Sequence, residues 1–191
     1  MRITGGTARG CRLTGPKRNN HSIRPTSDRV REAIFNILGD RITGATVLDL
    51  FAGTGSFGLE ALSRGAKSVV FVDNAPAALE IIGHNLRSGF TQPAARIFQF
   101  DLTWDKSLQT LHRQLSEGYR FSLIFLDPPY EKKLAEKLLK MVQRSGLPAD
   151  KAIIIAEERQ NQNLPAEIEQ LQLSDRRRYG ETGLWFYTFF T

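Results

Sequence analysis

The sequence contains one cysteine, Cys11, among 191 residues. No intrachain disulfide can form, which excludes disulfide-stapled secreted scaffolds and fits a reducing compartment. The three histidines, His21, His84 and His112, lack metal-ligand spacing, so we expect no metal. No apolar run approaches membrane-spanning length, and no apolar block follows the first residues. We therefore expect a cytoplasmic protein that does not associate with membranes.

Acidic residues are scarce at the start of the chain. Residues 1–31 carry eight basic side chains against one acid, Asp28, so this segment has a charge of +7 and the other 160 residues sum to −1. A basic segment on a nearly neutral remainder is typical of contact with the phosphates of nucleic acid. On charge alone, a solvated arm that only aids solubility is the alternative. The expected nucleic-acid contacts are Arg2, Arg9, Arg12, Lys17, Arg18 and Arg24.

The length and the 41% apolar content favour one sizeable core, in a single domain with small additions. From Ala45 onward short β-rich runs alternate with helical patterns, which predicts a doubly wound, mostly parallel α/β sheet of the Rossmann-like kind. The first five predicted strands are residues 46–51, 68–73, 95–100, 121–126 and 152–157. The predicted helices between them are residues 56–64, 76–88, 106–117 and 132–144.

The two ends of the chain add further elements. Residues 168–179 and 184–190, around a turn at 180–183, predict an antiparallel hairpin that completes seven strands. Val30, Ala33, Ile34, Ile37 and Leu38 have helical spacing, which predicts a helix over 27–38 that stops at the following glycine. Residues 2–13 suit a small basic hairpin. We therefore expect a basic extension of residues 1–25 and a catalytic domain of residues 26–191.

A glycine-rich loop follows the first predicted strand. Gly53, Gly55 and Gly58 form a G-x-G-x-x-G pattern before a helix, and Asp73 stands twenty residues after Gly53, at the end of the second strand. Glycines let the backbone approach a ligand closely, and an acid at the second strand end can accept hydrogen bonds from ribose hydroxyls. The pattern therefore predicts a site for an adenosine-bearing cofactor.

The charge of Asp49 discriminates between cofactors. This residue stands four positions before Gly53, close to where a pyrophosphate would lie, and its carboxylate would repel phosphate. S-Adenosylmethionine has no phosphate and carries an ammonium and a sulfonium, both attracted by a carboxylate. The loop therefore favours S-adenosylmethionine over NAD, with a structural role in capping a turn as the alternative for Asp49.

Other acids follow the next strands. Asp73 is placed to bind the ribose, and Asp101 the adenine amino group, with Asp105 as a nearby rival. Each acid alone would suit a turn or a helix cap, but ligands of open α/β sheets bind at the carboxyl ends of the strands. The expected cofactor contacts are Asp49, Phe51, Ala52, Gly53, Thr54, Gly55, Asp73, Asn74, Asp101 and Leu102.

A diproline segment follows the fourth strand. The prolines of Asp127-Pro128-Pro129-Tyr130 remove two backbone donors and hold the chain extended, so that nearby carbonyl groups point outward. Asp127 and the Pro128 carbonyl can accept hydrogen bonds from a planar amino group, and stacking of a base on Tyr130 contributes roughly 1–3 kcal/mol. A rigid turn is the alternative for these residues alone. Beside the glycine loop, the segment predicts amino-group methylation by positioning, with Asp127, Pro128, Pro129 and Tyr130 as the catalytic residues.

These two segments resemble class I amino-methyltransferases, a group that includes DNA adenine-N6, protein glutamine and RNA guanine-N2 enzymes. Arg2-Ile3-Thr4-Gly5-Gly6, the stretch 24–36 and Tyr179-Gly180-Glu181-Thr182 narrow the resemblance. With them, nearly the whole chain is similar to the bacterial 16S ribosomal RNA guanine-N2 methyltransferase family, whose members methylate guanine 966. The resemblance implies S-adenosylmethionine as cofactor and 16S rRNA as substrate, in a 30S particle or assembly intermediate. It also implies that the basic N-terminal segment contacts the RNA.

The chemistry of the base adds a preference. Guanine presents its N1–H beside the N2 amino group, and an ionised Asp127 can accept from both, whereas adenine has an acceptor next to its amino group. A DNA adenine-N6 methyltransferase shares both motifs and is the main alternative. About forty residues precede the sheet, too few for a target-recognition domain, which favours a structured RNA. An NAD-dependent oxidoreductase and a non-catalytic RNA-binding module are the remaining alternatives, and we infer no obligate protein partner.

Overall fold

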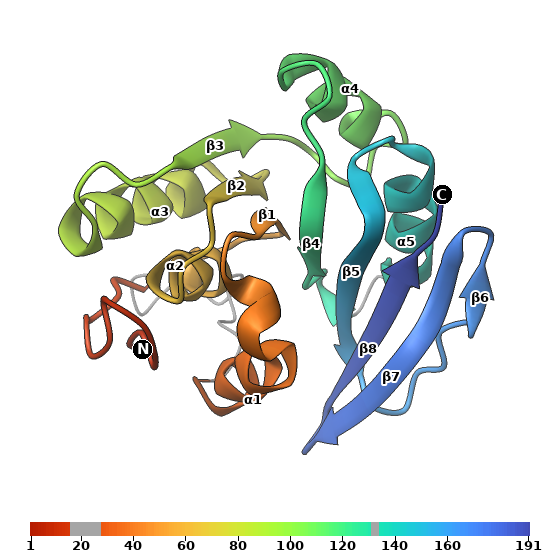
Figure 1. Ribbon diagram of the computed structural model, residues 1–191, viewed down its shortest axis with the longest axis horizontal. Helices are drawn as coiled ribbons and strands as arrows, with labels where there is room; N and C mark the ends of the chain where they lie inside the picture. Colours follow the sequence, from red (N-terminus) through yellow and green to blue (C-terminus); the bar gives the residue numbers. More distant parts are fainter. Residues whose placement is uncertain (16–27, 131–133) are drawn as a thin grey trace. The chain divides into compact units, whose positions relative to one another are not determined.

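The computed structural model describes residues 1–15, 28–130 and 134–191. They fall into two compact units, Met1–Phe100 and Asp101–Thr191, each combining strands with helices (Figure 1). Within these described ranges, no helix has the length and apolar character that crossing a membrane requires.

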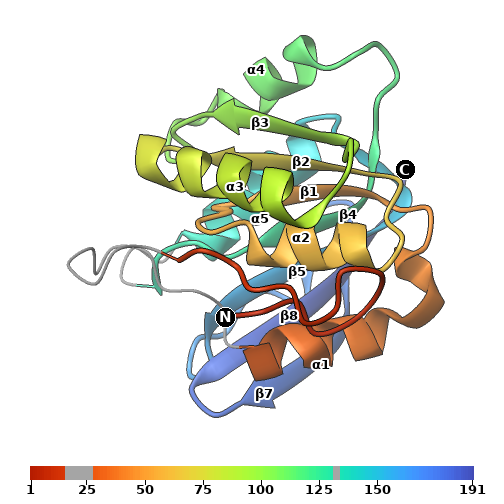
Figure 2. The ribbon, with the colours of Figure 1, turned by 90° about the vertical axis from the view of Figure 1, so that its left-hand side faces the viewer.

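The first unit holds three parallel strands in the order β3-β2-β1, with α2 and α3 side by side across them (Figure 2). The middle strand is almost completely buried from Val69 to Val72, which explains its continuous apolar sequence. The elements of this unit are α1 (Asp28–Leu38), η1 (Gly39–Ile42), β1 (Thr46–Leu50), α2 (Ser56–Ser63), β2 (Ser68–Asp73), α3 (Pro76–Gly89) and β3 (Ala95–Gln99).

Helix α1 has the predicted apolar stripe. Val30, Ile34 and Leu38 are buried, and Phe35 stacks on Phe57 of α2 with 5.0 Å between the ring centroids. The helix ends where predicted, because Gly39 adopts a positive φ of 53°. The helix predicted before the sheet is therefore confirmed from Asp28 onward.

The second unit orders its strands β4-β5-β8-β7-β6, with β4 and β5 parallel and the later pairs antiparallel. Helix α5 packs against β5 (Figure 1). The elements of this unit are α4 (Ser107–Gln114), β4 (Phe121–Leu126), α5 (Ala135–Arg144), β5 (Pro148–Arg159), β6 (Glu167–Ile168), β7 (Leu171–Tyr179) and β8 (Thr182–Phe189).

The predicted C-terminal hairpin is confirmed, with two differences in its boundaries. The predicted strand over 168–179 is split, because Glu169 adopts a φ of 51° and turns the chain, which adds the short strand β6. The hairpin turn has two residues, since Tyr179 pairs with Thr182 and Gly180 supplies a φ of 59°. Outside the hairpin, strand β5 is longer than predicted and runs from Pro148 to Arg159. With β6, the described residues form eight strands where seven were predicted.

The N-terminal residues form the predicted small hairpin within the first unit. Arg2 and Arg12 are bridged in antiparallel fashion, and Ile3 N–H donates to the Cys11 carbonyl at 3.0 Å. Three of the residues expected to contact nucleic acid, Lys17, Arg18 and Arg24, lie outside the described residues. The division into an extension of residues 1–25 and a domain of residues 26–191 stays a prediction.

Candidate active site

The glycine loop of the first unit is a tight turn after β1. Phe51, Gly53 and Gly55 all adopt positive φ values, of 59°, 55° and 75°. Gly55 N–H donates to the Ala52 carbonyl at 2.7 Å, which closes the turn. A positive φ is costly for a phenylalanine, and such strained residues persist at sites where the surrounding structure holds them. The glycines of the pattern thus supply two of the three positive φ values of this turn, while the predicted cofactor site stays a prediction.

Gly58 lies in the first turn of α2 and lets that helix approach the sheet. A Cβ at this position would come within 2.3 Å of the Phe71 ring and 2.8 Å of a Val69 methyl group on β2. No real Cβ tolerates such distances. The third glycine of the pattern is therefore needed for packing of the helix on the strand.

Asp49 is buried behind the loop, with 1% of its surface exposed. Its Oδ2 accepts a hydrogen bond from Gly58 N–H at 3.0 Å. Burial, reinforced by the negative charge of Asp73, raises the pKa of Asp49 to about 8, although the bond from Gly58 opposes the shift. A positively charged ligand group beside this carboxyl group would favour its ionised form and so lower its pKa.

Asp73 connects the glycine loop to the start of α3. Its Oδ2 accepts from Gly53 N–H at 2.8 Å, and its Oδ1 accepts from Ala75 N–H at 2.9 Å. Each carboxylate oxygen can accept two hydrogen bonds, so these contacts leave acceptor capacity for a ribose hydroxyl. The contact with Gly53 brings two of the predicted cofactor residues together, while the ribose role of Asp73 stays a prediction.

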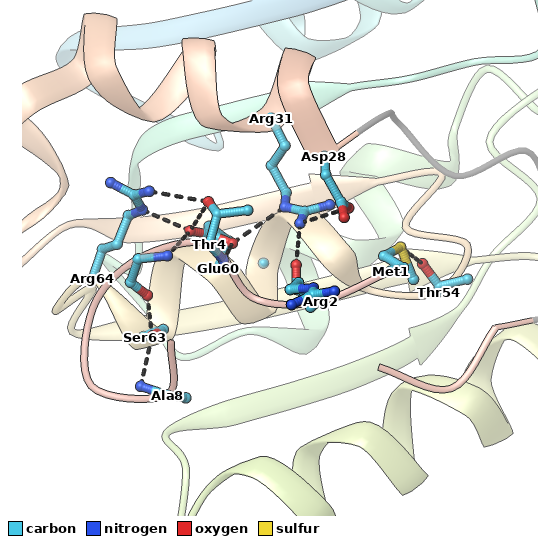
Figure 3. A network of polar contacts seen from close by, with 12 residues as sticks. Met1, Arg2, Thr4, Ala8, Asp28, Arg31, Thr54, Glu60, Ser63 and Arg64 are labelled. Atoms are coloured by element: carbon cyan, nitrogen blue, oxygen red, sulfur yellow. Dashed lines mark hydrogen bonds and ion pairs between the residues drawn. The ribbon is translucent and has the colours of Figure 1, made fainter. Parts of the chain in front are cut away.

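Asn85 of α3 is a part of this site that the sequence analysis missed. Its side-chain amide donates to the carbonyls of Thr54 and Thr14, each at 3.1 Å, and its oxygen accepts from Thr14 N–H at 2.8 Å. Met1 approaches the same loop residue, since the Thr54 hydroxyl lies 3.7 Å from its sulfur (Figure 3). The N-terminal hairpin therefore contacts the glycine loop directly and through Asn85.

Glu60 of α2 is the second residue that was missed, and it fixes the N-terminal hairpin on this helix. The fully buried carboxylate accepts from Thr4 N–H and Gly5 N–H, both at 2.8 Å, and pairs with Arg31 at 3.2 Å and Arg64 at 2.8 Å (Figure 3). Burial alone would raise the pKa of Glu60, but these hydrogen bonds and the two guanidinium groups lower it below its usual value.

The predicted nucleic-acid contacts of this hairpin lie on its outside. Arg2, Arg9 and Arg12 are all exposed. Arg2 and Arg12 are directly paired across the bridge, so their side chains leave the same face of the hairpin. This arrangement supplies two neighbouring positive charges to a ligand.

Asp101 and Leu102 lie in the second unit. Asp101 is exposed, and its Oδ1 accepts from Thr103 N–H at 2.9 Å and from the Thr103 hydroxyl at 2.6 Å, as in a capped turn. Leu102 is buried. The rival acid Asp105 pairs with Lys137 at 2.5 Å. The adenine role of Asp101 stays a prediction.

The diproline segment follows β4 and is anchored through its tyrosine. The Tyr130 hydroxyl donates to Glu157 Oε1 at 2.7 Å and lies 3.5 Å from the Thr182 hydroxyl. The Arg159 guanidinium lies over the Tyr130 ring, 5.7 Å from its centroid. Burial and the adjacent Glu157 carboxylate raise the pKa of Tyr130, so the phenol stays a neutral donor. The segment also contains half-buried Asp127, buried Pro128 and exposed Pro129.

The partners of Tyr130 were not identified as site residues from the sequence. Glu157 is buried at 3% exposure near the end of an apolar strand, and an acid in that position was the available signal. Thr182 belongs to the Tyr179–Thr182 motif, which was noted for its resemblance alone. Among the described residues, no cluster of three or more histidine, cysteine, aspartate or glutamate side chains is arranged to hold a metal ion.

Comparison with known proteins places these features in a family. The family described as "Conserved hypothetical protein 95" matches residues 1–188. The Ribosomal RNA small subunit methyltransferase D of Escherichia coli K12 is 31% identical over 187 residues, which are 98% of this chain and 89% of that protein. The solved structure of the Escherichia coli protein yhhF has a TM-score of 0.81 and 30% identity, covering 100% of this chain and 98% of that one.

A more distant structure shows the fold alone. An RNA methyltransferase from Salinibacter ruber in complex with S-adenosyl-L-homocysteine has a TM-score of 0.64 and 12% identity, covering 87% of this chain and 94% of that one. The predicted Rossmann-like methyltransferase fold is thereby confirmed. The chain belongs to the "Conserved hypothetical protein 95" family and to the group of the small-subunit ribosomal RNA methyltransferases D, as the resemblance in its sequence implied.

Proposed function

We propose that this protein transfers a methyl group from S-adenosylmethionine to the exocyclic N2 amino group of a guanine in 16S ribosomal RNA, within a 30S particle or an assembly intermediate. The observation that carries the cofactor assignment is the buried Asp49 carboxyl group beside the glycine loop. The assignment of ribosomal RNA rests on the similarity to the Ribosomal RNA small subunit methyltransferase D of Escherichia coli.

The residues of the first unit fit the proposed cofactor. S-Adenosylmethionine, when bound, supplies an activated methyl group on a sulfonium. Asp49 would neutralise its positive charge, the backbone of residues 51–55 would pass close to it, and Asp73 would hold its ribose. Asn74 completes the proposed contacts of this unit. In the second unit, Asp101 is proposed to accept from the adenine amino group, with Leu102 as a further contact. A dinucleotide is disfavoured, because its pyrophosphate would be repelled by Asp73 and would find no positive charge at Asp49.

The diproline segment would hold the amino group that is methylated. Asp127 and the Pro128 carbonyl would accept hydrogen bonds from the guanine N2 and N1 positions, which aims the nitrogen lone pair at the methyl carbon. Tyr130, fixed by its bond to Glu157, would stack on the base and keep its ring plane constant. Positioning and electrostatic stabilisation then supply the acceleration without a covalent intermediate. The amine would lose its proton after transfer.

The exposed arginines of the N-terminal hairpin would contact the RNA backbone. Arg2, Arg9 and Arg12 provide the charges on the described part, and Lys17, Arg18 and Arg24, outside the described residues, are the other proposed contacts. Because these contacts carry little sequence information, the folded shape of the RNA would select the target.

One experiment tests substrate and position together. Labelled cofactor is incubated with 30S particles that lack methylation, with naked 16S rRNA and with DNA, and the product is digested to nucleosides. We expect the label in N2-methylguanosine at one 16S position. Label in N6-methyladenine of DNA, or in no substrate, would contradict the proposal. A rise in melting temperature with S-adenosylmethionine and none with NAD is expected from the same protein.

A further inference from the structure

The motif Tyr179-Gly180-Glu181-Thr182 has no role in the proposed function beyond the contact of Thr182 with Tyr130. The motif forms the turn that joins β7 to β8. The residues around this turn are next to the diproline segment in space, because Thr182 and Glu157 both contact the Tyr130 hydroxyl. The turn is therefore adjacent to the group that would receive the target base.

The strand register places Arg159, Thr182 and Tyr179 in one row across the sheet, and Thr182 contacts Tyr130. Arg159 pairs with Thr182 across β5 and β8, and Thr182 pairs with Tyr179 across β8 and β7. Paired residues share a face of the sheet, and so do residues two apart on one strand. Arg177 therefore lies on the same face as Tyr179, about 7 Å along β7. We call Arg159, Arg177 and Tyr179 the hairpin surface.

The exposure and charge of this surface suit a polyanion. Arg159 and Arg177 are exposed and Tyr179 is half-buried. Arg177 forms one salt bridge, with Asp175 at 2.8 Å, and Arg159 forms none with any residue in the described ranges. The two acids that precede Arg159 along β5, Glu157 and Glu158, are buried at 3% exposure or less. The hairpin surface thus presents two guanidinium groups and a phenol ring to the solvent.

Arg176, the residue before Arg177 in β7, has a structural role. Its guanidinium stacks on Trp185 at 4.7 Å from the ring centroid and donates to the carbonyls of Gln160 and Gln162. Arg178 points to the same side as Arg176 and is exposed. The two faces of β7 therefore differ in their neighbours, since Arg177 shares its face of the sheet with Thr182, which contacts Tyr130.

We infer that the hairpin surface binds the phosphate backbone of the RNA strand whose base Tyr130 receives. Arg159, already over the Tyr130 ring, would hold a phosphate next to the target base. Arg177 lies two strand spacings across the sheet and two residues along β7 from Arg159, roughly 12 Å in all, and would hold a second phosphate. The Tyr179 ring, directly across the sheet from Arg159, offers a stacking face for a neighbouring base. This inference rests on the proposed function and extends the RNA contacts to the C-terminal hairpin.

The test compares a double variant with a matched control. In Arg159→Ala/Arg177→Ala, we expect the KM for the 30S substrate to rise roughly tenfold. The slope of log affinity against log salt should become shallower by about 1.4, since each lost single-strand phosphate contact removes about 0.7. The dissociation constant for S-adenosylmethionine, measured by calorimetry, should not change. Arg178→Ala, on the opposite face of the same strand, should keep the wild-type KM and slope.

Further variants separate charge from folding. Arg159→Lys/Arg177→Lys should recover most of the salt slope, because it restores both positive charges. A double alanine variant with wild-type KM and slope overturns the inference, and so does an equal loss in Arg178→Ala. If the wild-type protein methylates no ribosomal RNA, the proposed function itself fails. If the wild-type is active and the hairpin variants are undiminished, only this inference fails.

Discussion

Asp49 couples cofactor binding to a proton. Its pKa of about 8 means that the carboxyl group is largely protonated at pH 7, and a cationic ligand beside it would favour ionisation. We predict that S-adenosylmethionine binding releases close to one proton at pH 7 and almost none above about pH 9. Calorimetry in two buffers of different ionisation enthalpy measures this number. Asp49→Asn should bind without proton release, and more weakly, whereas the exposed Asp40→Asn should behave as wild type.

The same residue should oppose folding as the pH rises. The folded-state pKa of Asp49 lies above its unfolded value of 3.8, so its contribution to stability is fully present below pH 3.8 and is lost as the pH rises through about 8. We predict that the melting temperature of Asp49→Asn exceeds that of the wild type by an increasing margin between pH 4 and pH 8. Asparagine keeps an oxygen for Gly58 N–H, so the packing changes little. A margin independent of pH would contradict the assigned titration.

Asp127 should matter for transfer and not for cofactor binding. Removing its carboxylate in Asp127→Ala removes the proposed acceptor for the guanine amino group, and we expect kcat to fall about a hundredfold or more. The S-adenosylmethionine dissociation constant should stay within a factor of two, as measured by calorimetry. Activity that survives within a few-fold would exclude the diproline segment from the chemistry.

Tyr130 and Glu157 should act as one unit. Tyr130→Phe leaves the buried carboxylate without its phenol donor, which costs about 1–3 kcal/mol of stability and frees the ring to tilt. We predict matching losses of melting temperature and kcat in Tyr130→Phe and Glu157→Leu, and a double variant no worse than either. Glu157→Gln keeps an acceptor oxygen and serves as the control. Additive losses in the double variant would show that the two side chains act separately.

At the scale of elements, sequence patterns predicted a helix or strand correctly where the pattern lies within a single segment. The apolar run Val69–Val72 and the stripe of α1 predicted a buried strand and a packed helix, because their periodicity reports burial directly. The β6 turn was missed, since Glu169 has no sequence preference for the positive φ that it adopts. The local sequence thus predicts helices and strands better than it predicts the irregular turns between them.

The missed site residues share a different cause. Glu60 and Arg31 lie 29 positions apart, and both lie on predicted helices, where charged residues are usually solvated. Both side chains are buried because the N-terminal hairpin covers them, and the apolar periodicity of a helix cannot predict a contact with such a distant segment. The strand-end acids were found because parallel strands bring their carboxyl ends to one edge, although Asp101 shows that such an acid can also cap its own turn.

The Glu60 cluster gives a prediction at this scale. Glu60→Gln removes one of the two carboxylates that pair with fully buried Arg31 and leaves Asp28, so we expect a loss of about 3 kcal/mol and faster amide exchange at Thr4 and Gly5. Because the folded-state pKa of Glu60 is lowered, its stabilisation is present above the unfolded value of 4.5 and is lost as the pH falls through the folded one. Below that range wild type and variant should converge. Glu80→Gln, on the exposed side of α3, is the control.

At the scale of the whole molecule, the charge is divided unequally between the ends of the sequence. The first 31 residues carry +7 and the other 160 sum to −1, so long-range attraction to RNA should originate mainly at the N-terminal segment. Only part of this segment is described, and its exposed arginines are held on the helix that follows the glycine loop. A variant of these arginines should therefore weaken RNA binding while the glycine loop keeps its structure.

Salt dependence tests this division of charge. In Arg2→Gln/Arg12→Gln we expect RNA affinity to fall and the slope of log affinity against log salt to become shallower by about 1.4 to 1.8, the value for two phosphate contacts. Lys67→Gln/Arg87→Gln removes the same net charge from exposed positions elsewhere in the first unit and should change the slope by much less. Equal effects of the two double variants would mean that net charge alone attracts the RNA. A specific effect of the first pair, with unchanged S-adenosylmethionine affinity, would locate the phosphate contacts on the N-terminal hairpin.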